Sequence, residues 1–147
     1  MAEQASSGGP FRRRPPIDVL NAQREGCAVG HLGIELTELG PDFLRGRMPV
    51  DARTKQPYGL LHGGSSALLA ETLASIAANL CMEEGAGQAV GLELNCNHVR
   101  AMTEGWVVGT ARPLHVGRST QVWDIRIEDG QGRLVCASRL TLAVRKG

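Results

Sequence analysis

The sequence has few aromatic residues, little net charge and no long apolar run. It contains two Trp, one Tyr and two Phe in 147 residues, and its formal net charge at pH 7 is +1. A nearly neutral chain lacks the electrostatic field that binding to nucleic acid or to an anionic membrane requires. No apolar stretch approaches the ~20 residues needed to span a bilayer. We therefore expect a protein that binds neither nucleic acid nor membrane.

The four cysteines are widely separated, with no Cys-x-x-Cys pair and no histidine at metal-ligand spacing. The first sixteen residues, MAEQASSGGPFRRRPP, lack the apolar segment of a signal peptide. These features predict a cytoplasmic protein with reduced thiols and no metal site. They also predict a disordered tail over 1–16 and a single domain over 17–147, which is a typical domain length.

The order of predicted elements favours the α+β class. Apolar patterning and turn residues predict a short helix over 17–25, a hairpin from 31–39 and 43–50, a loop over 51–61, a long helix over 63–84 capped by Ser65 or Ser66, and strands over 89–101, 105–116, 120–129 and 133–145. One largely apolar helix separated from a run of strands indicates a curved antiparallel sheet wrapped around a central helix.

The long predicted helix contains a single charged residue. Glu71 is the only Asp, Glu, Lys or Arg between Gln56 and Met82, and apolar residues flank it on both sides. Because nothing else marks a solvent-facing side of this helix, we expect Glu71 to be buried. A carboxylate in such a place is a candidate general base or nucleophile.

The same helix begins with His62, Gly63 and Gly64. Glycines give a ligand access to the backbone, and the first N–H groups of a helix are unpaired donors with partial positive charge. The Gly63 N–H is therefore a candidate oxyanion donor for a carbonyl substrate. Two turns of helix, about 12 Å of rise, separate Gly63 from Glu71. We expect two antiparallel copies of the helix to share the site between subunits.

These residues resemble a known family. The string Gln56-x-x-Gly59-Leu60-x-His62-Gly63-Gly64, followed by Glu71 and Ser75, is similar to that of the hotdog-fold acyl-CoA thioesterases. The resemblance is to the branch that acts on aromatic acyl-CoA, such as hydroxybenzoyl-CoA and dihydroxynaphthoyl-CoA. It extends over the later strings GLELNCNHVR, GTARPLHVGRSTQVWDIRI and RLVCASRLTLAV, and so covers most of the chain from Leu32 to Val144.

The resemblance implies an acyl-CoA thioester hydrolase that needs no cofactor and assembles as a dimer of dimers. Glu71 would attack the thioester carbonyl or activate water, and the Gly63 N–H would polarise that carbonyl. His62 and Gln56 would support the thioester and the departing thiolate. The implied acyl or pantetheine contacts are Ser75, Asn97, His98 and Arg100, and the implied coenzyme A phosphate contacts are Arg118, Ser119 and Thr120.

Several alternatives remain open at this level. A proofreading thioesterase acting on acyl carrier proteins would use the same residues, and a hotdog dehydratase of 3-hydroxyacyl thioesters is a second enzymatic reading. A non-catalytic acyl-thioester binding module is less consistent with Glu71, since a pure binder gains nothing from a buried carboxylate. The sequence leaves open the acyl group and whether Glu71 is nucleophile or base.

Overall fold

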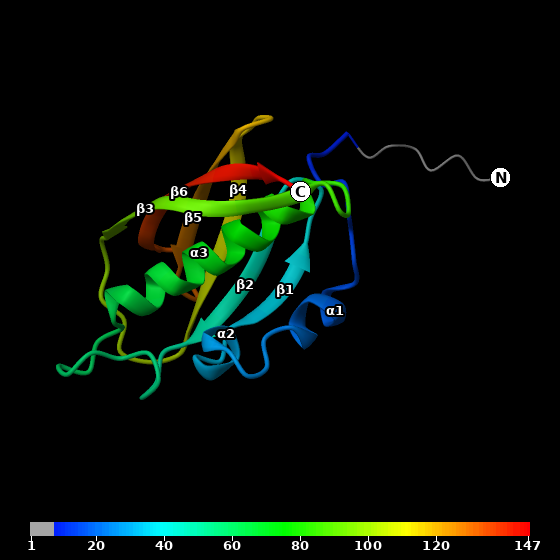
Figure 1. Cartoon of the computed structure of the whole chain (residues 1–147). Coiled ribbons are helices and arrows are strands. Elements are labelled where there is room, and N and C mark those ends of the chain that lie inside the picture. The colour runs from blue at the N-terminus through cyan, green and yellow to red at the C-terminus, as the bar shows by residue number, and fades with distance from the viewer. Residues whose placement is uncertain (1–7) are drawn as a thin grey trace.

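The computed structural model describes residues 8–147 of the chain. Six antiparallel strands form one sheet in the order β1-β2-β4-β5-β6-β3, and this sheet curves around the long helix α3 (Figure 1). The elements are α1 (Ile17–Ala22), α2 (Ala28–His31), β1 (Glu35–Leu39), β2 (Leu44–Pro49), α3 (Gly63–Leu80), β3 (Gly87–His98), β4 (Trp106–Val116), β5 (Thr120–Glu128) and β6 (Leu134–Lys146). The predicted α+β architecture is confirmed.

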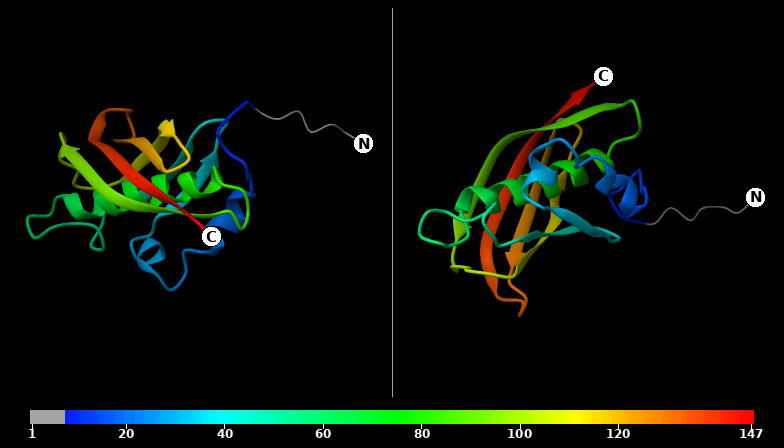
Figure 2. Two further views of the ribbon diagram at one scale, coloured as in Figure 1. Left: turned by 45° about the horizontal axis from the view of Figure 1, so that its top comes forward. Right: turned by 90° about the horizontal axis from the view of Figure 1, so that it is seen from below.

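Strand β5 shows why the sheet wraps the helix. Trp123, Ile125 and Ile127 alternate with polar residues, and all three are fully buried. Because side chains of a strand alternate between its two faces, this pattern gives the sheet one apolar face. That face packs against α3, which crosses the concave side of the sheet in both views of Figure 2.

A pair of glycines lets α3 approach the sheet closely. Gly46 of β2 lies opposite Gly109 of β4, and a Cβ on either residue would meet a methyl group of Leu73 at 2.9 or 2.6 Å. Leu73 is fully buried at the middle of α3. The two glycines thus let the helix lie closer to the sheet than larger residues would allow.

The helix α3 begins at Gly63 as predicted, but its capping residue and its C-terminal end differ from the prediction. The helix stops at Leu80 rather than residue 84, and its cap is His62 rather than Ser65 or Ser66. The imidazole Nδ1 of His62 accepts a hydrogen bond from the Gly64 N–H at 2.8 Å. Both serines lie inside the first turn and are buried. An imidazole nitrogen here provides the acceptor that a serine hydroxyl usually supplies.

The assignment of the whole of 1–16 to a disordered tail is wrong for its second half. The Phe11 ring is buried against Trp123, with ring centroids 6.2 Å apart. The Arg13 side chain donates hydrogen bonds to the carbonyl oxygens of Met82 and Asn79 at 3.0 and 2.8 Å. This stretch therefore covers the C-terminal end of α3. Residues 1–7 lie outside the described part of the chain.

Strand β3 is an edge of the sheet and runs antiparallel to α3. The side chain of Asn79 makes two 3.0 Å hydrogen bonds with the backbone of Ala89, near the C-terminal end of the helix. Near its N-terminal end, Gly63 lies against His98. Two residues of β3, Leu92 and Val90, expose 66% and 39% of their surface. No helix in the described chain is long and apolar enough to cross a membrane.

Candidate active site

The backbone N–H groups at the start of α3 have different partners. The His62 carbonyl accepts the Ser65 N–H at 3.0 Å, and the His62 side chain accepts the Gly64 N–H. Within residues 8–147, no acceptor is found for the N–H of Gly63. This donor lies at the partially positive end of an 18-residue helix. It is therefore suited to bind an oxygen that acquires negative charge.

The side chain of His98 reaches this point from β3. A Cβ added to Gly63 would lie 2.9 Å from the His98 Nε2. Two predicted site residues that are distant in the sequence are thus brought together. A larger residue at position 63 would displace the imidazole.

Glu71 lies beside β3, at the residue where that strand is irregular. A Cβ added to Gly91 would lie 2.8 Å from the Glu71 Oε1. The β3–β6 register shifts between Gly91 and Glu93, so Leu92 forms a β-bulge. Bulges often re-aim side chains near active sites. Here the bulge and the missing side chain leave space for the carboxylate.

The prediction that Glu71 is buried is wrong for the single chain. Its side chain is exposed, because β3 is the last strand of the sheet and nothing in the described chain covers that side of the helix. The neighbouring Ala70, Leu73 and Ala74 are fully buried, as the apolar sequence predicts. Only a further chain or a ligand would enclose the carboxylate.

Gln56 is held in the predicted loop before α3. Its side-chain Oε1 accepts a hydrogen bond from the Tyr58 N–H, and its carbonyl accepts one from the Gly59 N–H at 3.0 Å. An isolated bridge between Lys55 and Leu61 closes the loop. This ordering places Gln56 in the segment that leads into His62, while Tyr58 is 90% exposed at the tip of the loop.

The remaining predicted residues are spread over the surface of the single chain. Ser75 lines a depression of about 380 Å³ beside α1. Asn97 and Arg100 are exposed at the end of β3. A larger depression of about 980 Å³ lies around α2 and contains none of the predicted site residues.

The predicted phosphate-binding turn lies at the other end of the sheet. Thr120 pairs with Ala143 of β6, whereas His98 pairs with Cys136. Seven residues of a strand correspond to about 23 Å. Within one chain, Arg118, Ser119 and Thr120 therefore lie far from the start of α3, and the structure does not bring them together with Gly63.

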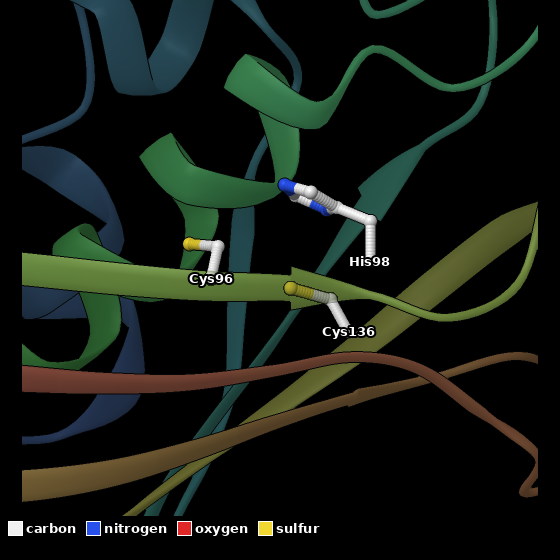
Figure 3. A group of neighbouring side chains, drawn as sticks. All are labelled: Cys96, His98 and Cys136. Atoms are coloured by element: carbon white, nitrogen blue, oxygen red, sulfur yellow. The ribbon is translucent and has the colours of Figure 1, made fainter.

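Two cysteines that the sequence analysis gave no role lie beside this site. The pairing of β3 with β6 brings Cys96 and Cys136 next to His98 (Figure 3). All four cysteines are free thiols, as expected. The sequence could have indicated that Cys96 lies near His98, because residues two apart in a strand place their side chains on the same face. The position of Cys136 came only from the strand register.

Residues 58–136 match the family described as the thioesterase superfamily. The chain belongs to this superfamily. It is 52% identical over 134 residues to 1,4-dihydroxy-2-naphthoyl-CoA hydrolase of Escherichia coli K12. The aligned region covers 91% of this chain and 98% of that protein. A proofreading thioesterase, EntH, of Cronobacter turicensis is also 52% identical, over 91% of this chain and 97% of its own.

Solved thioesterase structures agree with the fold. The crystal structure of a thioesterase from Haemophilus influenzae superimposes with a TM-score of 0.90 at 46% identity, covering 92% of this chain and 94% of its own. The predicted hotdog fold and the predicted enzyme class, a thioester hydrolase, are thus confirmed.

Proposed function

We propose that this thioesterase hydrolyses aromatic acyl-CoA thioesters, with Glu71 and the Gly63 N–H as the central catalytic groups. The observation that carries the proposal is that one helix has both a first N–H with no acceptor among residues 8–147 and an exposed carboxylate. The aromatic acyl group is suggested by the 52% identity to a dihydroxynaphthoyl-CoA hydrolase.

In the proposed reaction, the thioester carbonyl oxygen accepts a hydrogen bond from the Gly63 N–H. Glu71 then either removes a proton from an attacking water or attacks the carbonyl carbon itself, in which case water hydrolyses the resulting mixed anhydride and frees the carboxylate. The C–S bond breaks, the electron pair leaves with the thiolate, and the proton released by the water protonates the sulfur. Each backbone donor to such an oxyanion is worth roughly 3–4 kcal/mol of barrier. His62 and Gln56 would bind the thioester on the side of the departing sulfur.

Two chains are needed to bring these groups to one carbonyl, because eight residues of helix separate Gly63 from Glu71 by about 12 Å. The free edge of β3 supplies a surface for pairing. Gly91 lies beside Glu71, and His98 lies beside Gly63. An antiparallel pairing of two β3 strands that sets Gly91 opposite the second copy's His98 would therefore bring Glu71 to the second copy's Gly63. Leu92 and Val90 would be covered by this pairing.

The same assembly gives the remaining residues their proposed roles. The turn with Arg118, Ser119 and Thr120 carries donors suited to coenzyme A phosphates. Ser75, Asn97, His98 and Arg100 would contact the acyl or pantetheine part of the substrate. We propose that two such dimers associate into a tetramer.

A proofreading thioesterase is the second candidate function. The Cronobacter EntH protein is as similar to this chain as the naphthoyl-CoA hydrolase is. The two functions share the pantetheine arm and the thioester and differ in what the arm is attached to. Comparing kcat/KM for the same aryl group on coenzyme A and on a carrier protein distinguishes them.

The catalytic assignment is tested by hydrolysis of benzoyl-CoA, 1,4-dihydroxy-2-naphthoyl-CoA and a medium-chain acyl-CoA. We expect Glu71→Gln to lower kcat at least about 100-fold on the preferred substrate, since proton transfer by a positioned side chain typically contributes 10²–10⁴-fold. Glu84→Gln removes the same charge from an exposed position after α3 and serves as the matched control. The proposal would be contradicted if the parent hydrolysed none of the three substrates, or if Glu71→Gln retained most of the activity.

A further inference from the structure

Three potential metal ligands converge where β3, β6 and the start of α3 meet. One donor atom from each of Cys96, His98 and Cys136 lies within 4.8 Å of the other two (Figure 3). Cys96 is paired with Ser138 in the sheet, and His98 is paired with Cys136. The Ser138 hydroxyl donates a hydrogen bond to the Cys96 sulfur at 3.3 Å, and it lies 3.3 Å from the Cys136 sulfur. The proposed hydrolysis uses neither thiol.

We propose that Cys96, His98 and Cys136 form a binding site for a thiophilic cation of the Zn²⁺ class, and that its occupancy inhibits the thioesterase. Two thiolates and one imidazole are a ligand set that favours Zn²⁺ over Mg²⁺ or Ca²⁺, which prefer oxygen. Three protein ligands leave one position of a tetrahedral ion open to water or another small ligand.

The geometry requires little rearrangement. In a tetrahedral zinc site with bonds of 2.0–2.3 Å, the ligand atoms are about 3.7 Å apart. The three donors are already within 4.8 Å of one another, on adjacent strands whose backbone is held by the β3–β6 register. Cys136 is fully buried, Cys96 is half-buried and His98 is exposed, so an ion would enter from the His98 side.

The charges of such a site balance. Cysteine binds a metal as the thiolate, so each thiol releases its proton to water when the ion binds. A divalent ion with two thiolates and a neutral imidazole has no net charge. The partially positive start of α3 therefore opposes it only weakly.

Inhibition follows from the contact between His98 and Gly63. Because the His98 Nε2 lies 2.9 Å from the position of a Cβ on Gly63, an ion held by this imidazole would sit beside the backbone donor. It would fix the ring and occupy space that the thioester carbonyl needs. This second step rests on the proposed function, whereas metal binding does not.

Binding is tested with the metal-free full-length chain titrated with Co²⁺, whose thiolate charge-transfer and ligand-field absorption report sulfur ligands. We expect thiolate bands that saturate at one Co²⁺ per chain and disappear on addition of Zn²⁺. Cys96→Ala removes a half-buried ligand. Loss of a residue that only hydrogen-bonds to a metal ligand typically lowers metal affinity 10- to 100-fold, so loss of the ligand itself should weaken Co²⁺ binding at least about 100-fold. Cys27→Ala, at the exposed cysteine before α2, is the matched control and should bind as the parent does.

Inhibition is tested by initial rates of aryl-CoA hydrolysis at one equivalent of Zn²⁺, compared with the same enzyme in chelator. Initial rates are needed because the coenzyme A thiol that is released also binds Zn²⁺. The parent and Cys27→Ala should lose activity reversibly, whereas Cys96→Ala should keep its basal rate. Absence of thiolate bands, or unchanged Co²⁺ affinity in Cys96→Ala, overturns the site. Equal inhibition of parent and Cys96→Ala overturns the coupling. Co²⁺ binding by a chain that hydrolyses no thioester overturns the proposed function and leaves the site standing.

Discussion

Replacing Gly91 with alanine should displace the Glu71 carboxylate without harming the fold. The added Cβ would lie 2.8 Å from the Glu71 Oε1, so the carboxylate must retreat until the contact reaches at least 3.4 Å. The next nearest atom outside Glu71, a methyl of Leu140, is at an ordinary 3.6 Å. Since Glu71 is exposed, its side chain can rotate into solvent at little cost.

The backbone at this position accepts alanine. The φ angle of Gly91 lies outside the left-handed region, and Gly-to-Ala changes at compatible positions typically stabilise a protein by 0.4–1 kcal/mol through the unfolded state. The Tm of Gly91→Ala should therefore equal or exceed that of the parent. A misplacement of about 1 Å can cost about 10²-fold in rate, so we expect kcat to fall roughly 10- to 100-fold for this smaller shift.

The assay is steady-state hydrolysis of the preferred aryl-CoA together with thermal unfolding. Gly130→Ala is the matched control, because a Cβ at Gly130 meets no atom within 4 Å. In the Glu71→Gln background, Gly91→Ala should lower kcat little further, since both changes act on one group. A stable Gly91→Ala variant with parental kcat would refute the reasoning. So would full additivity of the two substitutions.

Two further predictions concern assembly and stability. Leu92→Lys puts a charge on the free edge of β3, and because edge lysines oppose strand pairing it should shift the protein to monomer in size-exclusion chromatography, with at least about a tenfold loss of activity. The control Leu114→Lys, on β4 and also exposed, should retain the β3-mediated dimer and its activity. A fully active monomer would contradict the shared site. Asp129 accepts hydrogen bonds from the backbone N–H groups of Arg133 and Gln131 and from the Arg133 side chain, and these lower its pKa below 3.8. Its stabilisation is present above that ordinary value and is lost as the pH falls through the folded-state pKa. Asp129→Asn should therefore lower the Tm at pH 7, with a difference from the parent that narrows below about pH 4; a pH-independent difference would assign the effect to something other than the charge.

Much of the fold was predictable because its signals are local. The alternation of Trp123, Ile125 and Ile127 with polar residues fixed the faces of β5, and the turn before β6 followed from Asp129 and the glycines after it. The hairpin of β1 and β2 was also predicted, although β1 starts only at Glu35, because His31 ends α2 and a turn follows it. Helix ends were less predictable, since the cap came from an imidazole rather than a serine.

The candidate site also has features that the sequence predicts and features that only the tertiary structure decides. The sequence by itself determined which groups are available, namely a lone carboxylate on an apolar helix and a His-Gly-Gly start, because residue type and helical spacing are properties of one short segment. Only the tertiary structure decided that Glu71 is exposed at the sheet edge beside Gly91, that His98 lies against Gly63, and that Phe11 and Arg13 cover the far end of α3. It also decided that Cys96 and Cys136 meet. These contacts depend on strand order and register, which long-range packing sets and no local pattern encodes.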